Sequence, residues 1–293
     1  MKSSPKDFLL LHLIVFIWGW SPILGKLISV QAFQLVWFRM FITLIAIAIY
    51  ILLIRQNLKI SKKEFFKLTG IGAVIAFHWF CFYHAIKVSN VSATLVAFST
   101  GTLFTSIIEP VFFKRKVLGY EIIFGLLIVG AIIMIFNVET QYALGILFGM
   151  LAAFTSSLFT VWNGLMIRTV PSPVITVYEL GGGFAALSIY LLLTGNLNAE
   201  FFAIPSQDWL WLSILAIVGT AFPFVASTNL LRKISPFTVT LTVNLETVYG
   251  IILAFFIWRK EESMTVTFYI GASIILATIL ANAVLKHRME KQP

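Results

Sequence analysis

Ten long apolar runs constrain the fold of this 293-residue chain more than any other feature. A run of about 20 apolar residues forms a helix that crosses the roughly 30 Å hydrocarbon core of a bilayer. Backbone polar groups in lipid must be satisfied within each segment, which favours helices. We therefore expect an all-α polytopic membrane protein with ten transmembrane helices, at 8–28, 33–54, 65–86, 90–113, 118–136, 144–167, 174–194, 209–231, 236–257 and 266–285.

The composition and the placement of charge agree with a membrane location. Charged residues make up only 11% of the chain, whereas soluble proteins carry about 25%. With the N-terminus inside, 16 of the 21 Lys and Arg fall on inner segments, and only Lys26, Lys87, Arg259 and Lys260 lie at outer ends. This asymmetry predicts that both termini are cytoplasmic. The net charge of +9 therefore sets orientation and does not indicate a nucleic-acid partner.

The chain also repeats itself at a shift of 146 residues. "AIKVSNVSATL" (85–95) lies over "LRKISPFTVTL" (231–241), and each half holds five predicted helices. Because five is odd, the second half enters the membrane upside down relative to the first. We expect a first repeat at 1–138 and a second, inverted repeat at 139–293. Inverted repeats are typical of transporters whose substrate site lies near the bilayer midplane, between the halves.

"FIWGWSPILGKLI" (16–28) carries a Trp-Gly pair followed by a Lys, and "WFRMF" (37–41) carries an Arg. "VGTAFPFVASTNLLRKISPFTVTL" (218–241) carries a Gly-Thr-Ala…Ser-Pro run, and "NLETVYG" (244–250) carries a Glu. These four stretches resemble the EamA-like family of the drug/metabolite transporter superfamily, with Thr247 in the place of the family's usual Pro. The resemblance implies ten helices in two inverted repeats and movement of small metabolites, often the export of amino acids or related compounds.

Glu246 is the central candidate for chemistry, because it lies near the middle of the 236–257 run. An ionisable side chain at that depth costs about 2.5–3.5 kcal/mol, so it usually faces a protein interior or an aqueous cavity. Thr242, Tyr249 and Gly250 share its helix face. There Glu246 would exchange a proton or hold a substrate ammonium. The alternative is a permanently protonated Glu that hydrogen-bonds a neighbouring helix.

Three further charged residues leave alternatives open. Arg39 would pair with Glu246 or with a substrate carboxylate, or else extend to the outer interface. Glu179 lies near the inner start of its helix and is either an inner gate or an interfacial residue, the second being favoured. Glu109 ends a stripe of hydroxyls in the fourth helix, and we expect it to be interfacial as well.

Polar and aromatic residues elsewhere complete the predicted site. Asn163 shares one helix face with Ser156 and Thr160. His78 either faces the cavity or is a hydrogen-bonded core residue. It lies six positions from His84, whereas metal-binding pairs lie three or four apart, so we expect no metal. The residues expected to bind substrate or protons are Glu246, Arg39, Trp18, His78, Tyr83, Trp162, Asn163, Asn244 and Tyr249.

We therefore expect a secondary transporter of small organic metabolites in a prokaryotic plasma membrane, working by alternating access. Protons are a candidate coupling ion, but the residues do not assign it. The cavity would be lined by helices 1, 3, 4, 6, 8 and 9. No cofactor is expected, because the sequence has no Walker motif or Gly-rich phosphate loop. Efflux is favoured by the family resemblance alone. An intramembrane enzyme acting on lipid or isoprenoid substrates and a non-transporting membrane scaffold are the alternatives, and the residues assign no oligomeric state.

Overall fold

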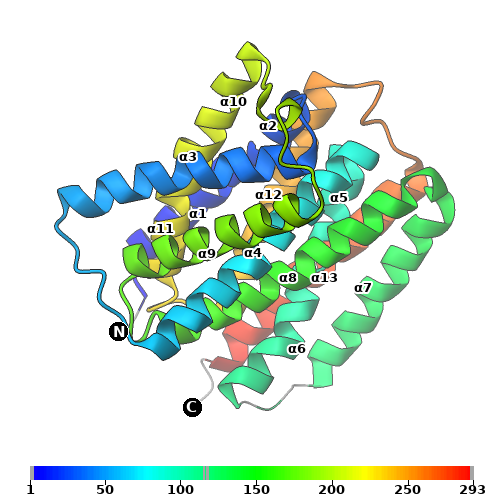
Figure 1. Cartoon of the computed structure of the whole chain (residues 1–293). Helices are drawn as coiled ribbons and strands as arrows, with labels where there is room; N and C mark the ends of the chain where they lie inside the picture. Colours follow the sequence, from blue (N-terminus) through cyan, green and yellow to red (C-terminus); the bar gives the residue numbers. More distant parts are fainter. Residues whose placement is uncertain (1–2, 115, 117–118, 291–293) are drawn as a thin grey trace.

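The computed structural model describes residues 3–114, 116 and 119–290, without the side chains at 121–122, 282–283 and 286–290. Lys2, Arg115 and Lys291, which contribute to the predicted orientation, lie outside the described residues. Helices dominate the chain (Figure 1). Their order is α1 (Pro5–Trp18), α2 (Ser21–Leu27), α3 (Ala32–Leu53), α4 (Lys62–Val88), α5 (Val91–Phe98), α6 (Gly101–Phe113), α7 (Gly119–Val138), η1 (Thr140–Tyr142), α8 (Ala143–Met166), α9 (Ser172–Leu193), η2 (Glu200–Phe202), α10 (Ser206–Ala216), η3 (Ile217–Ala221), α11 (Phe222–Leu230), α12 (Pro236–Ile257) and α13 (Val266–Glu290).

The helices form the predicted all-α polytopic bundle. In the described part of the chain, eight helical segments are long and apolar enough to cross a membrane, and two apolar helices, Ile123–Val138 and Val266–Ala281, are shorter. Large apolar side chains such as Leu52, Leu193 and Phe256 are exposed on the outer surface, as lipid contact requires. The start of α1 and the end of α13 lie at the same end of the bundle (Figure 1), which is what an even number of crossings produces.

Two of the crossings are interrupted. The first crossing breaks between α1 and α2 at Gly19 and Trp20, just before Pro22. The fourth breaks between α5 and α6, where the Ser99 hydroxyl donates to the Val96 carbonyl at 2.6 Å. The Thr100 hydroxyl does the same to the Ala97 carbonyl. Hydroxyls that bond the preceding turn compete with the helical backbone ladder, and Gly101, which follows them as the first residue of α6, is a poor helix former.

Carboxylates from each half hold helix starts of the other half. Glu262 accepts hydrogen bonds from the Val91 and Ser92 amides at the start of α5, at 3.1 and 2.9 Å. Glu109 accepts from the Phe237 amide at the start of α12, at 2.9 Å. Phe237 follows Val91 by the repeat shift found in the sequence. Such bonds satisfy amides that have no partner within their own helix. The interfacial position expected for Glu109 is therefore wrong, since its side chain is buried.

The same device occurs at two other helix starts. Asp208 of α10 accepts from the Ser29 and Val30 amides just before α3. Glu139, at the end of α7, accepts from the Thr265 amide just before α13. Both acids are buried. Four buried carboxylates thus join segments that lie far apart in sequence, and each one is matched to backbone donors rather than left in an apolar interior.

The packing leaves a space in the middle of the bundle. Helix α4 packs against α8 and α9, and α12 packs against α1, α5 and α6. Helices α7 and α13 pack against each other on one side of the bundle (Figure 1). The faces that α4, α8, α11 and α12 turn inward enclose the candidate site.

Candidate functional site

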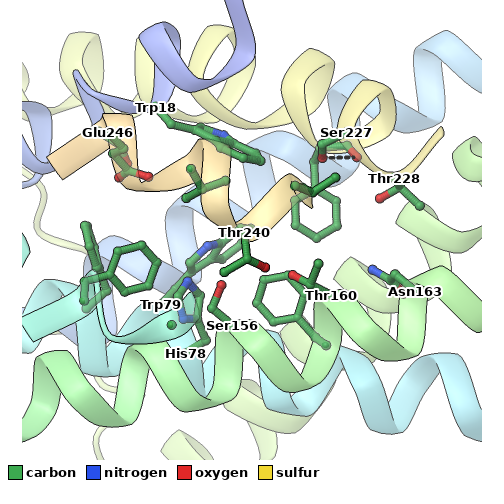
Figure 2. A pocket seen from close by; sticks show the side chains of 18 of the residues that line it. Trp18, His78, Trp79, Ser156, Thr160, Asn163, Ser227, Thr228, Thr240 and Glu246 are labelled. Carbon is green, nitrogen blue, oxygen red and sulfur yellow. Dashed lines mark hydrogen bonds between the residues drawn. The ribbon is translucent and has the colours of Figure 1, made fainter. Parts of the chain in front are cut away.

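A cavity of about 100 Å³ lies between the central helices (Figure 2). Its walls come from both halves of the chain, which is where the repeat predicts a substrate site. The lining residues are Trp18, Ser21, Arg39, His78, Trp79, Phe82, Phe98, Gly101, Ser156, Phe159, Thr160, Asn163, Phe224, Ser227, Thr228, Leu231, Val239, Thr240, Val243, Asn244 and Glu246.

Glu246 supplies the cavity with a carboxylate. Its side chain is only 6% exposed, and it lies beside Trp18 at one end of the cavity (Figure 2). No hydrogen bond to this carboxylate is present within the described part of the chain. Thr247, the next residue, instead turns its hydroxyl to the Leu95 carbonyl on α5, at 3.1 Å. The carboxylate is therefore available to a ligand or to water in the cavity.

Arg39 brings a positive charge to the same cavity. The side chain is 4% exposed, so it does not extend to the membrane interface. Its guanidinium donates to the Thr220 hydroxyl at 2.8 Å and to the Tyr83 hydroxyl. It also lies 3.9 Å from the centre of the Trp79 ring. These contacts hold the planar group in one orientation, as a bidentate donor requires.

A π-helical turn, η3, shapes the wall beside Arg39. One turn of π-helix frees carbonyl groups from the regular ladder, and such turns occur often at functional sites. The Gly219 carbonyl accepts from the Trp18 indole at 3.2 Å. The Thr220 hydroxyl donates to the Leu215 carbonyl at 2.7 Å. The turn thus fixes both Trp18 and the acceptor of Arg39.

His78 both faces the cavity and is hydrogen-bonded in the core, the two alternatives that the sequence left open. Its Nδ1 lies 2.8 Å from the Ala152 carbonyl, and because a carbonyl only accepts, Nδ1 carries the hydrogen. The ring also lines the cavity and packs edge-on against Phe159. His84 packs separately against Phe80 and Phe148. Among the described residues, no three His, Cys, Asp or Glu side chains come close enough to hold a metal ion.

The cavity extends toward the face where α8 and α11 end. Asn163 lies in the last turn of α8, and Thr228 and Leu231 lie at the end of α11. Asn163 and Glu246 occupy opposite ends of the cavity (Figure 2). The polar stripe predicted for the sixth crossing, Ser156, Thr160 and Asn163, therefore lines the wall between the centre and this face.

Ion pairs close the opposite face of the bundle. The Lys26 ammonium, at the end of α2, lies 2.8 Å from carboxylate oxygens of both Glu261 and Glu262. It also lies 4.6 Å from the centre of the Trp258 ring. Because Glu262 holds the start of α5, this cluster joins the first, fourth and ninth crossings above the cavity.

The family model of the EamA-like transporter family matches residues 6–137 and again residues 143–284. The chain belongs to the EamA-like transporter family. Its two matched segments are the two EamA repeats, and the family consists of transporters, not enzymes. The cavity of this EamA-like protein therefore lies between two repeats of a transporter.

Two known proteins are similar to this EamA-like chain. An uncharacterized transporter of Archaeoglobus fulgidus is 28% identical over 144 residues, which are 48% of this chain and 49% of that protein. The match thus spans about half the length of that relative. A solved crystal structure, described only as that of a protein, has a TM-score of 0.66 at 18% identity and covers 99% of this chain and 100% of its own. This second likeness concerns the fold alone.

Six of the nine predicted site residues line the cavity, and three lie outside it. Tyr83 is buried behind Arg39, where its hydroxyl also lies 2.8 Å from the Ser21 hydroxyl. Trp162 packs edge-on against Phe112, and Tyr249 packs edge-on against Phe16. Asn244 lines the cavity while its amide donates to the Thr102 hydroxyl.

Several wall residues were missed from the sequence: Ser227, Thr228, Thr240, Phe159 and Phe224. Thr240 had a signal, since it precedes Asn244 by one helical turn and shares its face. Ser227 and Thr228 are neighbouring hydroxyls in an apolar crossing. The two phenylalanines had no signal, because 28 phenylalanines are spread along the chain.

Proposed function

We propose that this EamA-like transporter is a secondary transporter that moves amino acids or related small organic compounds by alternating access. The observation that carries the proposal is that Glu246 and Arg39 both line the wall of one cavity between the two repeats. Buried charges of opposite sign in one small space suit a ligand that itself carries both an ammonium and a carboxylate.

The wall chemistry supports this ligand class. Glu246 has no hydrogen-bond partner in the described chain and accepts an ammonium group or a proton. Two N–H groups of Arg39 are already bonded, to Thr220 and Tyr83, and a guanidinium has five. The remaining donors are left for a carboxylate. Trp18, Phe159 and Phe224 offer apolar surface to the rest of the ligand.

The size of the cavity limits the ligand in this conformation. Pockets for drug-sized molecules measure roughly 300–1,000 Å³, whereas this cavity measures about 100 Å³. That volume suits a small amino acid or a few water molecules. A bulky side chain would require the walls to separate during transport.

The closed face and the extended cavity support alternating access. Lys26, Glu261 and Glu262 join three crossings on one face, while the cavity reaches toward the other. With the positive-inside orientation, the face joined by these ion pairs is the outer one, and the cavity reaches toward the inner one. The proposal places both termini in the cytoplasm and the protein in a prokaryotic plasma membrane. Export is the proposed direction, on the strength of the family resemblance.

Flux in proteoliposomes tests the proposal. The intact protein is compared with Glu246→Gln and Glu246→Ala, using a mixture of labelled common amino acids as the probe. Glu200→Gln is the matched control, because Glu200 is exposed in the η2 segment. We expect flux of at least one amino acid in the intact protein and the control, and at least a tenfold loss in both Glu246 variants. Unchanged flux in these variants would remove Glu246 from the mechanism, and no flux of any amino acid would contradict the proposed substrate class.

A further inference from the structure

A second acid, separate from Glu246, is enclosed beside the inner end of the cavity. Glu179 of α9 has an exposed fraction of 0%, so the interfacial position favoured by the sequence is wrong. Its Oε2 accepts one long hydrogen bond, 3.3 Å from the Asn163 amide nitrogen. Its Oε1 has no hydrogen-bond partner, and neither has the Oδ1 of Asn163. The hydroxyl of Thr176, one turn before Glu179 on α9, is also buried without a partner.

Close packing of two helices explains why Glu179 is buried. Gly72 of α4 faces α9 so closely that an added Cβ atom would lie 2.0 Å from the Glu179 carbonyl oxygen. Gly182 and Gly183 meet α4 in the same way, against Thr69 and Gly72. Because glycines stand at these contacts, the two helix backbones touch each other. Lipid and water are therefore excluded from the side of this turn of α9 that faces α4.

No positively charged side chain pairs with Glu179 in the described part of the chain. Helices α8 and α11 contain no titratable side chain. On α4, the titratable residues that flank Gly72 in the sequence are Lys67 and His78, and α3 carries Arg39 and Tyr50. None of these four makes a hydrogen bond or ion pair with Glu179 in the described chain. Tyr178, beside it on α9, donates instead to the Leu58 carbonyl.

One proton would satisfy two of the unpartnered atoms together. A primary amide and a carboxylic acid pair through two hydrogen bonds, one N–H to O and one O–H to O. The first already joins Asn163 to Glu179. A hydrogen on Oε1 would be a donor beside the free acceptor Oδ1 of Asn163, whereas the ionised form leaves two buried acceptors unmatched.

Asn163 connects this acid to the cavity. Its side chain lines the inner end of the cavity, on the wall opposite the end occupied by Glu246 (Figure 2). A ligand or water that bonds the Asn163 amide therefore competes with Glu179 for the same side chain. Occupancy of the cavity and protonation of the acid are linked through that competition.

We propose that Glu179 and Asn163 form a second proton-binding site, which gains or loses one proton according to what occupies the inner end of the cavity. Oε1 of Glu179 takes up one proton while Asn163 is bonded to the acid. When a ligand or water takes the Asn163 amide, that proton passes to water at the inner face. The role of this site in coupling rests on the proposed transport function, but proton binding itself does not.

Infrared difference spectroscopy of the purified full-length protein in lipid tests the site without any transported ligand. The C=O stretch of a protonated carboxylic acid is separate from the carboxylate and amide bands. The Glu246→Gln variant removes the acid that lines the cavity, and the double variant Glu246→Gln/Glu179→Gln removes Glu179 as well. Glu246→Gln/Glu200→Gln is the matched control. The other buried acids, Glu109, Glu139, Asp208 and Glu262, are present in every variant, so their absorption cancels when the variants are compared.

We expect the Glu246→Gln protein to keep an acid band near neutral pH that exceeds the band of the Glu246→Gln/Glu179→Gln variant by the area of one carboxyl group. The Glu246→Gln/Glu200→Gln control should keep this full area. Gln at position 179 still offers an N–H to Asn163, so its unfolding midpoint should match that of the parent. In Glu246→Gln/Asn163→Leu, which keeps the acid but removes its partner, the band should shift in frequency. A band unaffected by both changes would overturn the proposal.

A transport readout separates this inference from the proposed function. In proteoliposomes that contain a pH dye, Glu179→Gln should still exchange labelled amino acids across the membrane but should lose amino-acid-driven proton movement. Absence of amino-acid flux together with the expected infrared band would contradict the transport function and leave the proton site standing. Proton movement that is unchanged in Glu179→Gln would overturn the coupling role.

Discussion

The buried carboxylate of Glu262 lies 2.8 Å from the ammonium group of Lys26 and also accepts the first backbone amides of α5. One side chain therefore closes a face of the bundle and holds a helix start. Glu261, the preceding residue, also lies 2.8 Å from Lys26, but its side chain is 66% exposed against 0% for Glu262. The two acids make the same ion pair in different environments.

Glu262→Gln should destabilise the protein by about 3 kcal/mol, because it leaves Lys26 beside a buried neutral group and weakens the bonds to α5. Glu261→Gln is the matched control and should cost less than about 1 kcal/mol, as exposed pairs do. Thermal unfolding in detergent measures both. Equal shifts in the two midpoints would show that burial of Glu262 does not matter.

Gly72→Ala should destabilise the contact between α4 and α9 by about 1–3 kcal/mol or more, because the new methyl group meets the Glu179 carbonyl. Gly70→Ala, on the same helix, meets nothing within 4 Å. It should be neutral or stabilising by up to about 1 kcal/mol, since Ala favours the helix. Unfolding midpoints compare the pair. A stable Gly72→Ala protein would mean that the two helices separate readily.

Arg39→Lys should reduce both stability and flux, although the charge is kept. A single ammonium does not reproduce the planar fork that bonds Thr220 and Tyr83 while lying over Trp79. Loss of one such charge-assisted bond costs about 1.5–3 kcal/mol. Tyr83→Phe, which removes one acceptor and keeps the guanidinium, should have the smaller effect on amino-acid flux. If Lys supports full flux, Arg39 acts through charge alone.

Thr247→Pro would restore the residue that is usual in the family but should be harmful here. Proline removes a helix amide and clashes with the preceding turn, at a cost of about 3 kcal/mol or more. It also removes the bond from the Thr247 hydroxyl to Leu95. Thr247→Val is the control, since it loses the hydroxyl alone and should cost about 1 kcal/mol. Unfolding midpoints and flux in proteoliposomes distinguish the two, and a fully active Thr247→Pro protein would contradict the prediction.

Patterns within single helices predicted the parts of the site that depend on one helix face. The spacing of Ser156, Thr160 and Asn163 was enough to place them on one wall, and the depth of Glu246 was enough to place it in the cavity. The sequence did not decide between two positions for Arg39. Its inward position depends on acceptors 44 and 181 residues away in the chain.

Features that depend on packing between helices could not be predicted from the sequence. The burial of Glu179 follows from which face of α9 meets Gly72, and glycine positions alone do not give that face. Glu109 resembled an interfacial charge because its donor, the Phe237 amide, lies 128 residues along the chain. The break at Ser99 combines two hydroxyls bonded to the preceding turn with Gly101, and neither signal alone marks a break, because similar hydroxyl bonds occur within unbroken helices.

The exchange of carboxylates between the halves has a consequence for biosynthesis. The start of α5 is inserted early, yet the acid that holds it, Glu262, emerges from the ribosome some 170 residues later. The Phe237 amide, by contrast, finds Glu109 already in place. Until then the start of α5 relies on its local cap, in which Asn90 accepts from the Ala93 amide, and the last loop to be made completes the fourth crossing.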